Sequence, residues 1–87
     1  MKILEIRDIQ REEGHIYYRR NFSAVVLIEL PLKNVESSIN FIIEMLPTGK
    51  KEVDLDIVED VEYPIIPLKN AIIKTILDMD YEGQLPW

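Results

Sequence analysis

Residues 16–30 read IYYRRNFSAVVLIEL, and this stretch decides the fold class. Every second side chain is apolar, from Ile16 through Phe22 to Leu30, with Arg20 as the exception. A period of two places alternate side chains on opposite faces of a strand. The stretch therefore predicts a strand whose even-numbered residues face the core. Because it is far longer than the usual strand of about 5–6 residues, we expect a bulge or kink near residues 19–21.

Two further strands are predicted on either side of this stretch. Residues 2–9 are rich in Ile and Leu, and the polar cluster at residues 12–15 includes a glycine suited to a chain reversal. Residues 52–57 read EVDLDI, a strict alternation of acidic and apolar side chains. This alternation predicts a strand with one face of solvated carboxylates.

Two helices complete the predicted fold. Pro31 ends the long strand, Asn34 is a good N-cap, and apolar residues recur at helical spacing over residues 35–46. A second helix is expected after Pro67, with Leu68 and Ile72 on its apolar face. We therefore expect one α+β domain over residues 1–87: a two-layer sandwich with a three- to four-stranded mixed sheet and two helices on one face, in the order β-β-α-β-α. A strand–helix–strand crossover makes two of the strands parallel. Residues 80–87 are expected to form a non-helical tail.

The composition excludes several classes of function. Apolar residues make up 47% of the chain and charged residues 30%, the balance of a soluble globular domain. The chain has no cysteine and one histidine, His15, which removes disulfide frameworks, thiolate zinc sites and cysteine nucleophiles. No phosphate-binding glycine loop or nucleophile motif is present. We expect a protein that is not an enzyme and holds no cofactor or metal. Its apolar runs are far shorter than the roughly 20 residues that cross a bilayer, so we expect no membrane association. The first eight residues carry no secretory pattern, and we expect a cytoplasmic protein.

The acidic charge is concentrated in the later two-thirds of the chain. The net charge is −6, and all of it arises after residue 31, since residues 1–31 contain as many acidic as basic side chains. This balance disfavours nucleic acid as a partner of the whole molecule. All five arginines lie in the first part, however. There Tyr17, Arg19 and Arg20 form a candidate ligand site, because aromatic rings stack on bases and arginine binds phosphate. The alternative, which we favour, is that the neighbouring aromatic residues belong to the core and the arginines pair with glutamates.

Six carboxylates between Glu52 and Glu62 form a second candidate cluster. Oxygen-rich clusters of this kind bind Mg²⁺ or Ca²⁺. Three of the six alternate with apolar residues, which is equally typical of the solvated side of a half-exposed strand. We favour the solvated strand.

The apolar faces of the two expected helices are broader than one small sheet can cover. We therefore expect self-association, as a dimer, through Phe41, Met45 or Trp87. The function that follows is a non-catalytic protein-interaction or regulatory module with a further, unidentified protein partner. The alternative is a small nucleic-acid or nucleotide-binding protein that uses Arg19, Arg20 and the neighbouring tyrosines.

Overall fold

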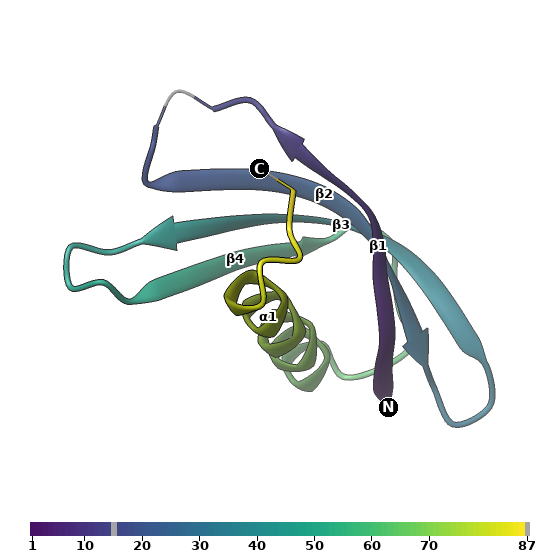
Figure 1. Ribbon diagram of the computed structural model, residues 1–87. Coiled ribbons are helices and arrows are strands. Elements are labelled where there is room, and N and C mark those ends of the chain that lie inside the picture. Colours follow the sequence, from purple (N-terminus) through teal and green to yellow (C-terminus); the bar gives the residue numbers. More distant parts are fainter. Residues whose placement is uncertain (15, 87) are drawn as a thin grey trace.

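Four strands and one helix make up the fold, which is α+β as the sequence predicts (Figure 1). The computed structural model describes residues 1–14 and 16–86. Predictions that concern His15 and Trp87 therefore lie outside the described residues. The elements are β1 (Lys2–Glu12), β2 (Arg19–Glu29), β3 (Asn34–Met45), β4 (Lys51–Ile57) and α1 (Ile65–Tyr81). The strands form one sheet in the order β1-β2-β3-β4, and every neighbouring pair is antiparallel.

The core lies between the sheet and α1, which crosses one face of the sheet (Figure 1). We call this covered face the inner face and the opposite one the outer face. The even-numbered residues of β2 line the inner face as predicted, and Phe22, Val26 and Ile28 are at most 1% exposed. Leu68 and Ile72 of α1 are fully buried against them. Burying apolar surface in this way is the main force that holds the helix to the sheet.

The predicted helix at residues 35–46 is wrong, because these residues form strand β3. β3 pairs with β2 without interruption, from Asn34 opposite Glu29 to Glu44 opposite Arg19. With β3 in place of a helix, the predicted crossover and the parallel strands also disappear. The sheet is an antiparallel meander with one helix, not a mixed sheet with two helices.

The physical reason is side-chain shape and alternation. The odd-numbered residues of β3 face the core, and Ile39, Phe41 and Ile43 are each 1% exposed. Val35 and three isoleucines are β-branched, which favours the extended backbone over a helix. A polar side chain on the inner face, Ser37, and an apolar one on the outer face, Ile42, hide the period of two from a simple reading of the sequence.

The irregularities of the sheet lie in β1, not at the predicted kink near residues 19–21. The β2 strand begins at Arg19, after a turn in which the Arg19 N–H donates to the Ile16 carbonyl at 3.1 Å. The pairing of β1 with β2 shifts register twice, and Asp8 adopts a left-handed backbone with φ 52°. These features are characteristic of β-bulges, which bend and twist a strand.

The predicted second helix is confirmed as α1, and it continues through Tyr81. Asp80 and Tyr81 therefore belong to the helix and not to the predicted non-helical tail. Gly83 follows in a left-handed conformation, φ 69°, which a glycine adopts without strain at a helix end. Within the described residues, no helix has the length and apolar character that crossing a membrane requires.

Candidate functional site

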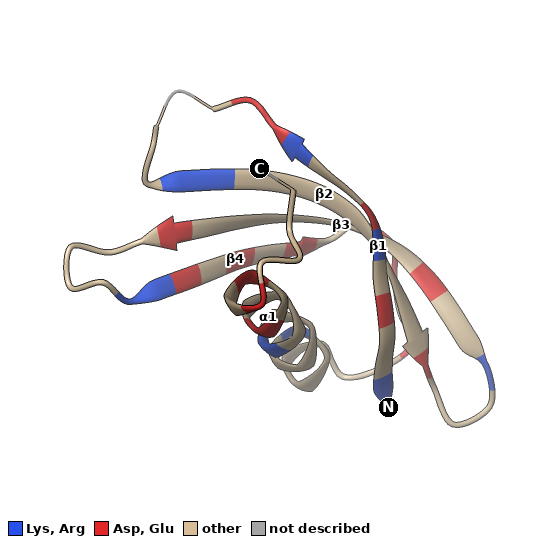
Figure 2. Cartoon of the chain, viewed as in Figure 1, with Lys and Arg blue, Asp and Glu red and all other residues tan. Residues whose placement is uncertain are grey.

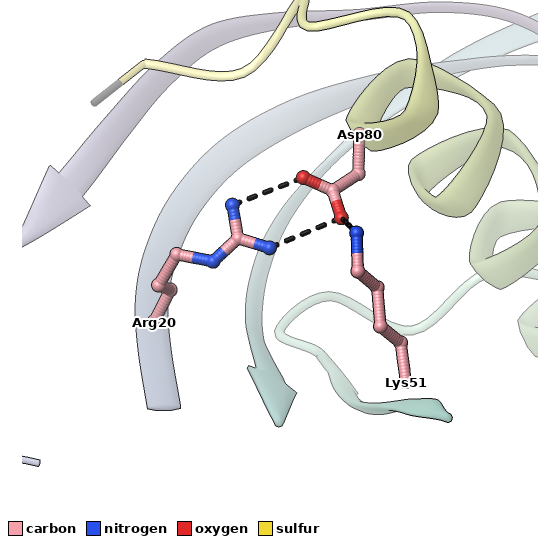
Figure 3. A network of polar contacts seen from close by, with 3 residues as sticks. All are labelled: Arg20, Lys51 and Asp80. Atoms are coloured by element: carbon pink, nitrogen blue, oxygen red, sulfur yellow. Dashed lines mark hydrogen bonds and ion pairs between the residues drawn. The ribbon is translucent and has the colours of Figure 1, made fainter. Parts of the chain in front are cut away.

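Arg20 breaks the apolar alternation of β2, and its partner is Asp80 in the last turn of α1. The two guanidinium nitrogens Nη1 and Nη2 of Arg20 donate to the two carboxylate oxygens of Asp80, each at 3.0 Å (Figure 3). Lys51, the first residue of β4, donates from Nζ to Asp80 Oδ2 at 2.5 Å. One carboxylate therefore joins three elements that are distant in sequence. Paired donors from arginine to a carboxylate are among the stronger hydrogen bonds in proteins.

This network is largely shielded from solvent. The side chain of Asp80 is 7% exposed, and those of Arg20 and Lys51 are 26% and 21% exposed. Burial by itself raises the pKa of the Asp80 carboxyl, but the hydrogen bonds and charges of Arg20 and Lys51 outweigh it. The pKa of Asp80 is consequently below its ordinary value, and the side chain is an anion near neutral pH.

The network forms one wall of a hollow of about 480 Å³, which we call the tyrosine hollow. Its lining residues are Arg11, Tyr17, Tyr18, Arg20, Ile43, Met45, Lys51 and Asp80. Three cations therefore face a single carboxylate, an excess of positive charge in a chain whose net charge is −6. Figure 2 shows the basic ends of β1, β2 and β4 gathered at this end of the sheet.

The two tyrosines project beyond the core in the turn before β2. Tyr17 is 96% exposed and Tyr18 is 44% exposed, and their ring centroids are 5.7 Å apart in an edge-to-face arrangement. The Tyr18 carbonyl accepts a hydrogen bond from the Met45 N–H at 2.9 Å, which attaches the turn to the end of β3. A second hollow of about 490 Å³, on Leu46 and Pro47, also includes both tyrosines.

The predicted ligand residues divide between the two faces of the sheet. Tyr17 and Arg20 meet in the tyrosine hollow. Arg19 does not, because its Nε donates to Glu44 Oε2 at 3.1 Å on the outer face. The predicted pairing of arginine with glutamate thus applies to Arg19, whereas the partner of Arg20 is an aspartate.

Two of the predicted interface residues can be located. Phe41 is 1% exposed and stacks on Phe22 with ring centroids 5.0 Å apart, so it belongs to the core. The expectation that Phe41 contacts a second copy is wrong for that reason. Met45 is 42% exposed at the rim of the tyrosine hollow, and Trp87 lies outside the described residues.

Three residues of the hollow were missed by sequence reasoning: Arg11, Lys51 and Asp80. They are separated by dozens of residues and carry no motif. One signal was present, the charge of Arg20 at a position whose neighbours two residues away face the core. A charge at such a position requires a partner from another element, because an unpaired charge is costly to bury.

The carboxylates of β4 lie on the outer face, away from α1. Asp54 and Asp56 are exposed and border a shallow hollow of about 220 Å³ together with Glu12, Asn21 and Asn40. Among residues 1–14 and 16–86, no group of three or more acidic or histidine side chains is arranged to hold a metal ion. Their exposed position agrees with the solvated face that the alternation predicts.

A smaller polar contact fixes the segment after β4. Ser37 is the buried polar residue of the inner face, 1% exposed, and its hydroxyl donates to Glu59 Oε2 at 2.8 Å. The Ser38 N–H donates to the same oxygen at 2.6 Å. The hydrogen bond from Ser37, followed by that from Ser38, lowers the pKa of the Glu59 carboxyl below its ordinary value.

Comparison with known proteins gives a family but no individual relative. No curated protein and no solved structure is detectably similar to this chain. One family model matches residues 1–81, which include all four strands, the helix and every residue that lines the tyrosine hollow. The chain therefore belongs to the BB_0187 family.

Proposed function

We propose that this protein is a non-catalytic binding module and that the tyrosine hollow binds a small anionic ligand with a planar ring, of the nucleotide class. The observation that carries the proposal is the excess of cations in a hollow flanked by two exposed tyrosines. Arginine binds phosphate through paired donors, and lysine binds it as a point charge. Aromatic side chains stack on bases without regard to sequence.

The size and charge of the surroundings favour a single nucleotide over a long nucleic acid. The hollow of about 480 Å³ lies within the range of about 300–1,000 Å³ typical of small-molecule sites. A polynucleotide would extend onto the neighbouring outer face, where Glu44, Glu52 and Asp54 border a further hollow. Those carboxylates repel a chain of phosphates.

Titration with AMP, followed by NMR, tests this proposal. We expect AMP to shift the amide signals of Arg11, Tyr18 and Lys51 at low salt, with affinity that falls as salt is raised. Arg11→Gln should weaken binding, because it removes a cation from the hollow. Arg19→Gln is the matched control, since Arg19 pairs with Glu44 on the outer face, and it should leave AMP binding unchanged. The absence of any shift at millimolar AMP and low salt would overturn the proposal.

The second candidate function is a protein-interaction or regulatory module that also self-associates as a dimer. A separate observation favours it: large apolar side chains are exposed around the same end of the sheet. They are Ile16 (40%), Tyr17 (96%), Tyr18 (44%), Met45 (42%) and Tyr81 (80%). Tyrosine, methionine and arginine are enriched at the centres of protein interfaces. Under this candidate the hollow receives a side chain of a protein partner.

Sedimentation equilibrium tests the second candidate. We expect a dimer at high micromolar concentration, and Tyr17→Ser should shift it toward the monomer because this side chain has almost no contacts within its own chain. Leu32→Ser is the control, since Leu32 is 98% exposed in the turn between β2 and β3. A monomer near 10.2 kDa for the wild type would contradict self-association. The cytoplasmic location expected from the sequence belongs to both candidates, and cell fractionation tests it.

A further inference from the structure

We propose that Asp80 is a built-in competitor for the anionic group of the ligand, so that ligand binding releases Asp80 and loosens the end of α1. This inference rests on the proposed nucleotide site. It concerns the regulation of that site and commits to a phosphate as the group that replaces the carboxylate.

The first step is that the donors a phosphate needs are already occupied. Both terminal nitrogens of Arg20 and the Nζ of Lys51 bind the carboxylate of Asp80 (Figure 3). Arg11 makes no hydrogen bond or ion pair with any residue that the structure describes. A phosphate that entered without displacing Asp80 would gain Arg11 alone and would lie beside a like charge. Exchange of one anion for the other removes this repulsion and gives the phosphate all three cations.

The second step is that Asp80 lies where an unpaired carboxylate destabilises the structure. It belongs to the last turn of α1, which contains no basic residue, and the negative end of the helix dipole repels an anion there. Arg20 and Lys51 are therefore the groups that make this position favourable for Asp80. Once they bind another anion, the same carboxylate acts against the helix end.

The third step is that the chain after Asp80 depends on the geometry of this turn. The Glu82 N–H donates to Asp78, the Gly83 N–H to Asp80 and the Gln84 N–H to Met79, at 3.1, 3.1 and 2.9 Å. Beyond them Leu85 is 7% exposed and fixes the tail to the core. Release of Asp80 weakens these three hydrogen bonds, so the occupied hollow differs from the empty one in the order of residues 82–85. By linkage, any partner that holds the tail in place weakens ligand binding by the same factor.

The test compares Asp80→Asn with Asp78→Asn, using AMP as the probe. Asp78 is two residues away, exposed, and pairs with Lys74 at 3.5 Å outside the hollow. We expect Asp80→Asn to bind AMP about tenfold more tightly than the wild type, since the competing charge is gone, and Asp78→Asn to bind like the wild type. Equal or weaker binding by a folded Asp80→Asn variant would overturn the inference.

Amide hydrogen exchange of the wild type provides a second measurement that needs no variant. Saturating AMP should speed exchange at Glu82, Gly83 and Gln84 severalfold, while exchange at core residues such as Val26 slows or stays unchanged. If AMP binds and exchange at residues 82–84 slows or does not change, the inference is wrong but the nucleotide site stands. If AMP binds neither the wild type nor a folded Asp80→Asn variant, the proposed function itself fails. Should Asp80→Asn not fold, the exchange measurement decides alone.

Discussion

Asp80 is the residue at which the helix is joined electrostatically to two strands. Its carboxylate binds Arg20 of β2 and Lys51 of β4, which enter the sheet at the same end. Neither strand supplies the negative charge that its own cation needs, and α1 supplies it for both. Removing one member of such a shielded group leaves the others unpaired, which costs more than the intact group contributes.

The lowered pKa of Asp80 gives a prediction about pH. A carboxyl whose folded pKa lies below its unfolded value stabilises the fold fully above the unfolded pKa, here near 3.8, and loses that contribution as pH falls through the folded pKa. The gap in unfolding free energy between the wild type and Asp80→Asn should therefore be large at pH 6 and should shrink as pH falls below about 4. Urea unfolding at pH 6 and pH 3 measures it. A gap that widens at pH 3 would contradict this account of Asp80.

Ser37 and Glu59 give a second prediction at the same scale. The Ser37 hydroxyl is the leading cause of the lowered pKa of Glu59. Ser37→Ala should raise the pKa of Glu59 toward its ordinary value of 4.5, although the Ser38 N–H still donates to it. An NMR titration of the Glu59 side-chain carboxyl carbon measures the shift. Ser23→Ala, on the outer face of β2, is the control and should leave this pKa unchanged, and an unchanged value in Ser37→Ala would refute the assignment.

Among the elements, β3 is where sequence reasoning failed. Its apolar residues satisfy a helical stripe almost as well as an alternation, because Ile42 is apolar on the outer face and Ser37 is polar on the inner one. The helical stripe left Phe41 and Met45 unexplained, and the alternation accounts for both. What resolves the ambiguity is the row of partners on β2, such as Phe22 opposite Phe41, and these long-range pairings leave no local signal.

The buried Phe22–Phe41 pair gives a prediction for this element. Phe41→Ala should destabilise the protein by about 3–5 kcal/mol, since it leaves a cavity in the core and removes the ring that Phe22 stacks on. Chemical unfolding measures the change. Ile42→Ala, the next residue but on the outer face, should cost less than half as much. A loss below about 1 kcal/mol in Phe41→Ala would show that the ring is not part of the core, on the scale that core truncations set.

The strands predicted over residues 2–9 and 52–57 and the second helix were recognisable because each has a strong local pattern. Residues 52–57 alternate strictly, and the α1 stripe of Leu68, Ile72 and Ile76 is fully buried as its spacing predicts. The tyrosine hollow was only half recognisable. Tyr17 and Arg20 are near one another in sequence, whereas Lys51 and Asp80 come from β4 and α1 and meet Arg20 only through the fold.

At the scale of the whole molecule, one helix covers one face of one sheet, and stability depends on that single contact. Without α1, the inner-face side chains of β2 and β3 lose their cover. An isolated sheet with an exposed apolar face does not remain folded as a monomer in water.

Truncation of the chain tests this dependence. A chain of residues 1–64, which lacks α1, should lose cooperative unfolding in urea, because Leu68, Ile72 and Ile76 are all 0% exposed in the intact protein. A chain of residues 1–81 keeps the helix and is the matched control. It should unfold cooperatively but be less stable by about 1.5–3 kcal/mol, the value of burying one leucine side chain such as Leu85. Cooperative unfolding of the 1–64 chain would show that the sheet is stable alone.

The two outermost strands of the sheet differ in a way that limits fibril growth. β1 is broken by two register shifts and the left-handed Asp8, so it offers no long straight template for another chain. β4 is regular, but a second β4 laid beside it would bring Glu52, Asp54 and Asp56 against the same carboxylates of its neighbour. Stacking of copies into a cross-β ribbon is thus opposed at one rim by shape and at the other by charge, and acid, which neutralises the second rim, is the condition under which such ribbons should first form.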